Sequence, residues 1–332
     1  MITAADFIKL PYTSDLTEGG IAYAIRSLQH VGDGMSGSVY SRLRHIVAGI
    51  AVELAFRRYL GENDIPFIVK NPTAFSEPAR YDVSLGGHRC DIHTYLTSKR
   101  NQIIAMRSNP ALVLRAPALI PEGQFASANH SEHDLNLFAF LLGLTTNSPE
   151  EIQKAVNAGQ RSYLIHPMQP NWSQPQIWAP LGRLALKSEC IQQINIEIGG
   201  LDRDRNFIVE NVTLDHLQRI YAVNNYYSLV YIHSSMIPDM RIGIHCANKG
   251  EPYIIHPHQW GNIWVYGMEI WMGGYMAREE FRRKSSTIFA GSRVFQYSKT
   301  QTSTLSVLVC DLHSLEDLFS RVKDWNLVKR MR

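Results

Sequence analysis

The spacing of apolar residues predicts a long helix followed by three short strands in the first third of the chain. Between residues 41 and 60 apolar side chains recur every three or four positions, which is the period of one helix face, and Ser41 is a suitable N-cap. Residues 66–69 are strand-like. Residues 80–94 then alternate around Gly86-Gly87, and a Gly-Gly pair between two strands is typical of a tight hairpin turn.

The hairpin register predicts that two carboxylates lie side by side. Counting outward from Gly86-Gly87 places Asp82 opposite Asp91, and directly opposed residues share a face with their Cβ atoms about 5 Å apart. Two carboxylates at that distance repel each other, and a divalent cation offsets the repulsion. His93 follows Asp91 by two residues, so it projects from the same side of its strand.

A third acidic residue comes from the predicted helix. Glu53 stands in an apolar stretch, where burial of a carboxylate is costly unless it is paired or binds a metal ion. The order is therefore a helix with Glu53, a strand, a strand beginning at Asp82, a tight turn, and a strand with Asp91 and His93 two residues apart. This order resembles the PD-(D/E)xK nuclease superfamily, which has the restriction-endonuclease-like fold.

The resemblance implies a metal-dependent active site. In the family, an acid on the first helix, an aspartate on one strand and an acid-x-Lys on the next strand hold Mg²⁺ and activate water. Glu53, Asp82 and Asp91 match the acids, and the backbone carbonyl of Ile92 would assist them in holding Mg²⁺ or Mn²⁺. The chain departs from the motif at the lysine, because His93 stands there and would orient or deprotonate the attacking water. It also has tyrosine in place of the motif's proline.

The resemblance further implies an α/β (α+β) fold, with a restriction-endonuclease-like core whose central mixed sheet is flanked by helices. Residues 1–110 would form the first part of that core, 111–225 an inserted module, and 226–332 the completion of the sheet and a C-terminal helix. The segment 274–281 is similar to one that follows the catalytic strands in family members. Residues 135–144 are apolar on nearly all sides and are interpreted as a buried helix, and Gly199-Gly200 as part of a turn. Further predicted elements are helices at 149–158, 277–284 and 314–325, and strands at 194–198, 207–210, 226–233 and 241–245.

Composition permits nucleic-acid binding without demanding it. The 332 residues carry a net charge of +3, and 45% of them are apolar, which argues against a disordered chain. Several basic residues are predicted to contact DNA phosphates, a type of contact that positions a duplex without reading its sequence. These are Arg89, Lys99, Arg100, Arg282, Arg283 and Lys284.

The four cysteines lack the Cys-x-x-Cys spacing of a zinc ribbon and suit a reducing compartment. The first residues lack a signal-peptide pattern, and the longest apolar run, 135–144, is too short to span a bilayer. We therefore expect a cytoplasmic protein with no membrane segment.

The leading hypothesis is a DNA endonuclease or nickase of a bacterial restriction or phage-defence system, with a link to DNA phosphorothioation as one option. Other defence-system subunits are candidate partners, and a homodimer would be needed to cut both strands. The alternative is a DNA-binding or assembly subunit with the same fold and no hydrolysis, which the missing lysine favours. Asp82 and Asp91 could also be solvated hairpin charges, and His93 a satisfied polar residue.

Overall fold

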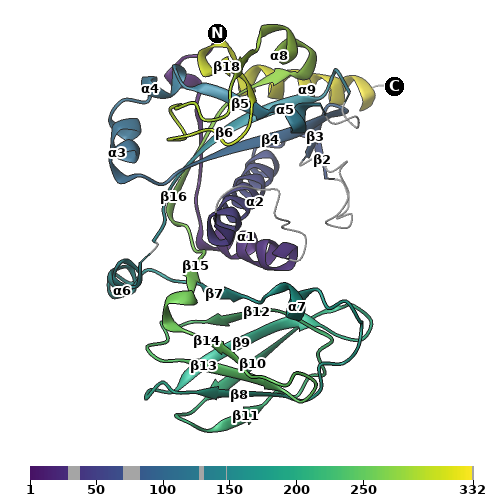
Figure 1. Cartoon of the computed structure of the whole chain (residues 1–332). Helices are drawn as coiled ribbons and strands as arrows, with labels where there is room; N and C mark the ends of the chain where they lie inside the picture. Colours follow the sequence, from purple (N-terminus) through teal and green to yellow (C-terminus); the bar gives the residue numbers. More distant parts are fainter. Residues whose placement is uncertain (29–37, 70–82, 127–130, 147, 331–332) are drawn as a thin grey trace. The chain divides into compact units, whose positions relative to one another are not determined.

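The computed structural model describes residues 1–28, 38–69, 83–126, 131–146 and 148–330 (Figure 1). The chain divides into two compact units. The first contains residues 1–20, 45–144 and 265–332, and the second contains residues 21–44 and 145–264. The boundaries differ from the predicted insertion at 111–225. Residues 111–144 belong to the first unit because one of the central strands of its sheet lies there, and residues 226–264 belong to the second.

The first unit is built on a six-stranded mixed sheet. Its strands, in spatial order, are β1 (Ile8–Leu10), β16 (Tyr266–Ala277), β6 (Leu135–Leu144), β4 (His88–Thr97), β3 (Val83–Leu85) and β2 (Phe67–Ile68). Only the central β4–β6 pair is parallel, and each other neighbouring pair is antiparallel. The described chain is therefore mixed α/β, with a mixed sheet and several helices.

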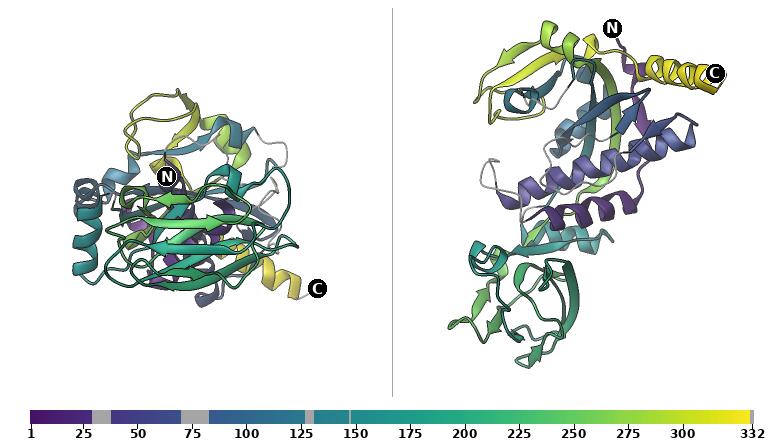
Figure 2. Two further views of the ribbon diagram at one scale, coloured as in Figure 1. Left: turned by 60° about the horizontal axis from the view of Figure 1, so that its bottom comes forward. Right: turned by 90° about the vertical axis from the view of Figure 1, so that its right-hand side faces the viewer.

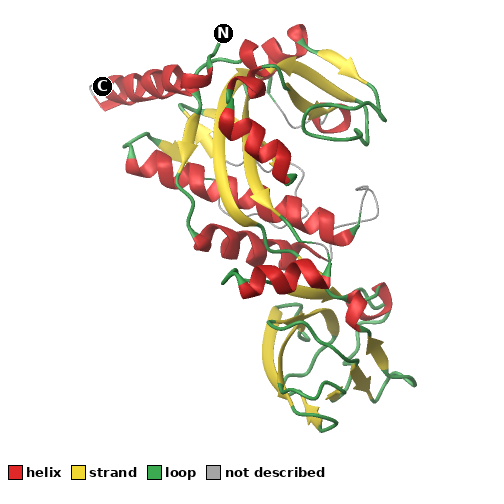
Figure 3. Ribbon diagram, turned by 90° about the vertical axis from the view of Figure 1, so that its left-hand side faces the viewer, coloured by secondary structure: helices red, strands yellow, loops and turns green. Residues whose placement is uncertain are grey.

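Helices cover both faces of this sheet. The helix α2 (Val39–Glu62), of which residues 45–62 belong to the first unit, lies in front of the strands in the right-hand view of Figure 2. The helix α3 (Arg100–Ser108) lies in front of them in Figure 3, which shows the sheet from the opposite side. The predicted helix at 41–60 is thus confirmed with slightly wider bounds.

A second layer packs on the α3 face. It contains the short helices α4 (Ala111–Leu114), α5 (Glu122–Phe125) and α8 (Arg278–Lys284), and the three-stranded sheet β17 (Ser286–Ile288), β18 (Thr304–Leu308) and β5 (Pro117–Pro121). Their apolar side chains share one core cluster with Tyr95, Phe138 and Phe140 of the large sheet. On the other side, Phe319 of α9 (Leu315–Arg330) packs against Phe56 of α2, with ring centroids 6.2 Å apart. The helix α1 (Ser14–Ser27) is joined to α2 by an ion pair between Asp15 and Arg58.

The prediction of a helix at 135–144 is wrong, because this segment is the strand β6. Residues 135–143 are all buried, since β6 lies in the middle of the sheet and is covered on both faces. A strand buried on both sides shows no alternation of apolar and polar residues, so its pattern cannot be told from that of a buried helix.

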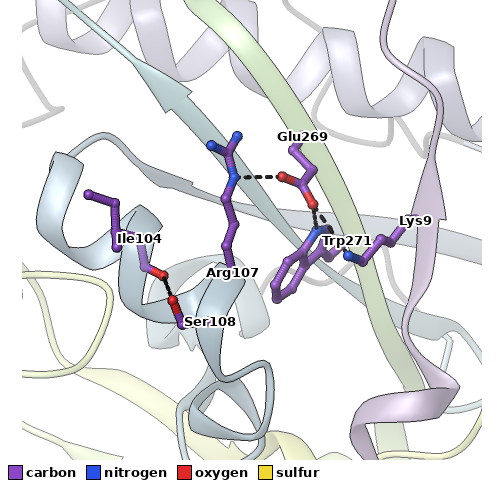
Figure 4. Close-up of polar contacts among 6 residues, drawn as sticks. All are labelled: Lys9, Ile104, Arg107, Ser108, Glu269 and Trp271. Carbon is purple, nitrogen blue, oxygen red and sulfur yellow. Dashed lines mark hydrogen bonds and ion pairs between the residues drawn. The ribbon is translucent and has the colours of Figure 1, made fainter.

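Glu269 of β16 links three elements of the first unit (Figure 4). Its carboxylate accepts hydrogen bonds from Trp271 Nε1 at 2.7 Å and from Arg107 Nε of α3 at 2.8 Å, and lies 3.5 Å from Lys9 Nζ of β1. Burial acts to raise the pKa of Glu269, but these hydrogen bonds and charges outweigh it, so the pKa lies below its ordinary value. The carboxylate therefore stabilises the fold in its charged form.

Replacing Glu269 by glutamine is expected to lower the free energy of unfolding by about 1 kcal/mol at pH 7, because the charge-assisted bonds weaken while the side-chain shape is kept. Since the folded-state pKa lies below the unfolded one, this stability is present above pH ~4.5 and is lost as the pH falls through the folded-state pKa. Urea unfolding at neutral and acid pH measures it. The exposed Glu62→Gln is the matched control, and an equal deficit for Glu269→Gln at both pH values would contradict the assignment.

The second unit has two antiparallel sheets. One contains β10 (Phe207–Leu214), β9 (Ile194–Leu201), β12 (Ser228–Ser234), β7 (Leu164–Pro167) and β15 (Gly261–Asn262), and the other β11 (Arg219–Tyr221), β8 (Leu184–Ser188), β13 (Ile242–Cys246) and β14 (Tyr253–Ile255). Residues of both sheets, such as Ile198 and Ile244, share one apolar core. Also present are α6 (Pro149–Asn157) and α7 (Pro170–Ser173).

Local sequence signals account for part of this unit. The helix α6 begins as predicted, with Ser148 Oγ accepting a hydrogen bond from the Glu151 amide at 3.2 Å. The prediction of a turn at Gly199-Gly200 is wrong, because both glycines lie inside β9. They are required there by close packing: an added Cβ on Gly199 would collide with the ring of Tyr231 on β12.

A partly buried polar cluster lies on β9, β12 and the segment before β7. Glu197 accepts hydrogen bonds from Tyr163 Oη at 2.9 Å and Tyr231 Oη at 2.7 Å, and His233 packs edge-on against the Tyr163 ring. Burial lowers the pKa of His233 to about 4, although the charge of Glu197 acts in the opposite direction. His233 is therefore neutral in the folded protein at pH 7.

Lowering the pH from 7 towards 4 is expected to destabilise the second unit by up to about 3 kcal/mol, because the unfolded chain takes up a proton on His233 near pH 6.5 while the folded chain resists it. Urea unfolding of the wild-type chain and His233→Asn at a series of pH values measures this. The difference between the two chains should change mainly between pH ~6.5 and ~4. A constant difference across that range would show that His233 does not carry the effect.

Candidate functional site

The β3–β4 hairpin has the predicted register. Leu85 pairs with His88 and Val83 with Cys90, and the turn between them is made by Gly86 and Gly87 with φ of 57° and 88°. These positive φ values suit glycine and explain the Gly-Gly pair. The next predicted pair, Asp82 with Asp91, cannot be compared, because Asp82 lies outside the residues that the structure describes. The opposition of Asp82 to Asp91 stays a prediction.

Asp91 and His93 project from the α3 face of the sheet. Alternate residues of a strand share a face, so both point to the same side as Tyr95. Tyr95 belongs to the core cluster of that face, and its hydroxyl donates a hydrogen bond to the carbonyl of Leu119 in β5 at 2.8 Å. The candidate site on β4 therefore faces the layer that contains β5 and α8.

Glu53 is not brought to Asp91 and His93. It lies on α2, which covers the opposite face of the sheet (Figures 2 and 3). Its side chain is buried, with 4% of the residue exposed, and forms an ion pair with Arg57 one helical turn later. A buried carboxylate needs such a partner, so the pair explains Glu53 without a metal ion.

His93 is held firmly by its neighbours on β6. Its Nε2 lies 3.0 Å from Asn136 Oδ1, and its ring stacks on Phe138 with centroids 5.3 Å apart. Because an amide oxygen only accepts, Nε2 carries the proton in this assignment. Asn136 is itself 3% exposed, and its Nδ2 has no hydrogen-bond partner among the described residues. The imidazole is thereby fixed in orientation at the position where the motif has lysine.

The charge of Asp91 acts on an arginine from α8, whose guanidinium lies over the ring of Phe125 at 4.1 Å. The β4–β6 register pairs Asp91 with Asn136, so both lie at one end of the two strands. The amide of Arg278 donates to the carbonyl of Asp134 at 2.8 Å, which places the start of α8 at this end. Burial lowers the pKa of Arg278, whereas the charges of Asp91 and Asp134 act to raise it. The guanidinium and Asp91 therefore interact electrostatically.

The described donors do not make a complete metal centre by themselves. No group of three or more His, Cys, Asp or Glu side chains that could hold a metal ion occurs within the described part of the chain. Asp91 and the Ile92 carbonyl supply oxygen atoms of the kind that Mg²⁺ prefers, and a fuller set would have to include Asp82. The candidate site thus comprises Asp91, His93, Asn136 and Arg278.

Asn136 and Arg278 were not predicted as site residues. Asn136 was missed because residues 135–144 were interpreted as a helix. In the structure they form the strand β6, in which Asn136 pairs with Asp91 of β4. Asn136 is the one amide side chain among the apolar residues 135–144. A single polar residue in such a segment was the sequence signal that could have identified it. Arg278 lies in the 274–281 segment noted in the sequence. The pairing of β16 with β6 brings the start of α8 to this end of the sheet, and the sequence does not reveal that pairing.

The predicted DNA-contacting residues have different surroundings. Arg282 pairs with Glu132 at 2.8 Å on exposed surface, where such pairs contribute little to stability. The exposed Lys284 pairs at 2.8 Å with the half-buried Glu280. Arg283 is exposed and Arg89 is half-buried on β4. Lys99 and Arg100 line a pocket at the start of α3. None of these placements tests DNA binding.

Searches against protein-family models, curated proteins and solved structures found no match for this chain. Among the described helices, none combines the length and apolar character needed to cross a lipid bilayer.

Proposed function

We propose that the chain is a metal-dependent nuclease that cleaves DNA at the Asp91 end of β4. The observation that carries the proposal is the register of the β3–β4 hairpin, which agrees with the predicted pairing from Leu85–His88 to Val83–Cys90. The hairpin also follows α2 and β2 in the predicted order. It supports Asp91 as one of a pair of carboxylates at the end of a central strand. An arginine that interacts electrostatically with Asp91 and an imidazole of fixed orientation are groups that phosphodiester chemistry uses.

Each residue has a distinct role in this proposal. Asp91, Asp82 and the carbonyl of Ile92 would hold Mg²⁺ or Mn²⁺, and the bound cation would neutralise the scissile phosphate and lower the pKa of a water molecule. Arg278 would bind a phosphate oxygen, as guanidinium groups do with bidentate geometry. Asn136 would keep His93 oriented toward the attacking water. Glu53 is assigned to its ion pair with Arg57.

Incubation of the purified chain with supercoiled plasmid tests the proposal. We expect conversion to nicked or linear DNA with Mg²⁺ or Mn²⁺ and none with a chelator, because the cation is required for the chemistry. A nicked product would indicate a monomer acting on one strand, and a linear product a homodimer. Intact plasmid under every metal condition would contradict hydrolysis. Membership of a restriction or phage-defence system, with or without phosphorothioated DNA, is part of the proposal and rests on the resemblance alone.

A second candidate is a DNA-binding or assembly subunit without hydrolysis. It is favoured by the burial of His93, which is 8% exposed and packed between Asn136 and Phe138 at the position of the motif lysine. It is also favoured by the pairing of Glu53 with Arg57 on the other face of the sheet. This candidate predicts that the wild-type chain retards plasmid in a gel and leaves it intact with either metal.

A further inference from the structure

A pocket lies at the other end of β4 from Asp91. It has a volume of about 660 Å³ and is lined by residues 99–102, at the start of α3, and 293–298, in the loop between β17 and β18. Ligand pockets for small molecules are commonly ~300–1,000 Å³, so a nucleotide is of suitable size. The pocket begins just after Thr97, six residues beyond Asp91, which is ~20 Å along an extended strand. It is therefore distinct from the candidate site above.

The lining is strongly basic. Lys99, Arg100 and Arg293 are exposed cationic residues, and the described residues that line the pocket include no Asp or Glu. Within the described part of the chain, none of the three forms an ion pair with a carboxylate. A concave surface of one charge sign raises the local concentration of the opposite charge. The pocket therefore favours an anion.

The start of α3 adds backbone donors to these cations. Lys99 is the N-cap residue, with extended backbone and no side-chain cap hydrogen bond, and the first turn has no acidic residue. The first amide groups of a helix have no partner within the helix and carry the positive end of its dipole. Phosphate groups bind at such ends. Here the helix start, at residues 100–102, is part of the pocket lining itself.

Gln296 contributes to the lining and joins its loop to β5, because its Nε2 donates a hydrogen bond to the carbonyl of Pro117.

Aromatic residues complete the lining. Phe295 and Tyr297 both contribute to the pocket and are half-buried. Burial raises the pKa of Tyr297 to about 12, so its hydroxyl stays protonated and adds no negative charge. Aromatic rings stack on bases of any sequence. Cations, helix amides and aromatic rings together match the parts of a nucleotide.

We propose that this pocket binds a nucleoside monophosphate, either as a free nucleotide or as the phosphorylated terminal nucleotide of a DNA strand. The cationic side chains and the start of α3 receive the phosphate, and the aromatic residues Phe295 and Tyr297 contact the nucleoside. The proposal does not depend on hydrolysis at Asp91. A chain that binds nucleotides and leaves plasmid intact would satisfy it.

Calorimetric titration of the whole chain with dAMP, deoxyadenosine and inorganic phosphate tests the proposal. We expect saturable binding of dAMP that weakens with rising salt, and weaker binding of the other two probes, since each has only part of the required chemistry. The double variant Arg100→Gln/Arg293→Gln should bind dAMP at least ~10-fold more weakly, the loss typical of a charge-assisted hydrogen bond. Lys323→Gln, an exposed substitution on α9, is the matched control and should bind as the wild type does.

Short DNA strands with and without a 5′-phosphate distinguish the two sources. Tighter binding of the phosphorylated strand than of dAMP supports a strand end, and binding of dAMP alone supports a free nucleotide. The proposal is overturned by equal dAMP affinity in the double variant and wild type, by inorganic phosphate binding as tightly as dAMP, or by no saturable dAMP binding at ~1 mM. Thermal unfolding of each variant checks that its fold is retained.

Discussion

Replacing Asp91 by asparagine is expected to lower the rate of plasmid cleavage by a factor of about 1,000 or more while DNA binding is retained. Asparagine keeps the shape of the side chain but removes the charge that would hold a divalent cation, and loss of one group that stabilises transition-state charge commonly costs 10²–10³ in rate. Asp91 is half-buried in the first half of β4 and is absent from the apolar core, so the substitution replaces no part of that core. Conversion of supercoiled plasmid to nicked DNA measures the rate.

A control and a contrary outcome make this test decisive. Asp324 is exposed on α9, and Asp324→Asn removes the same charge from the first unit without touching the candidate site. It should cleave at the wild-type rate. If Asp91→Asn also cleaves at the wild-type rate, Asp91 is not part of the active centre. If the wild-type chain binds plasmid and never cleaves it, the candidate without hydrolysis is correct.

The parts of the fold that were predicted correctly are those set by local sequence. A two-residue Gly-Gly turn determines which residues pair on either side of it, so the pairing of Val83 with Cys90 followed from the turn alone. The helix α2 followed from an apolar period sustained over five turns. Ser148 before proline identified the start of α6. Each signal acts between residues close together in the chain.

The parts that were missed depend on contacts between distant residues. A local sequence pattern does not indicate which face of a sheet a helix covers. The position of Glu53 on α2, across the sheet from the face on which Asp91 projects, was therefore not predictable from residue spacing. Asn136 reaches Asp91 only through the parallel pairing of β4 with β6. The basic pocket likewise joins Lys99 and Arg293, which are far apart in sequence. Sequence patterns therefore predicted the hairpin register up to Val83 and Cys90, whereas tertiary packing determines which distant residues lie near it.

Replacing Gly200 by alanine is expected to lower the free energy of unfolding of the second unit by about 3 kcal/mol or more. An added Cβ would collide with the carbonyl oxygen of Ser228 and lie 2.6 Å from the Tyr226 ring. The carbonyl belongs to the backbone of β12, which pairs with β9, so it can move only if the two strands separate. Overpacking that displaces backbone costs 1–3 kcal/mol and sometimes more.

Hydrogen exchange of the β9 and β12 amides measures this effect locally, because opening of these strands exposes their hydrogen-bonded amides. Gly250→Ala is the matched control, since nothing lies within 4 Å of a Cβ added there. We expect faster exchange in residues 194–201 and 228–234 of the Gly200 variant and wild-type exchange in the control. Equal exchange in both variants would mean that β9 and β12 are not packed as closely as the structure describes. The two strands pack so closely at Gly200 that only glycine fits there.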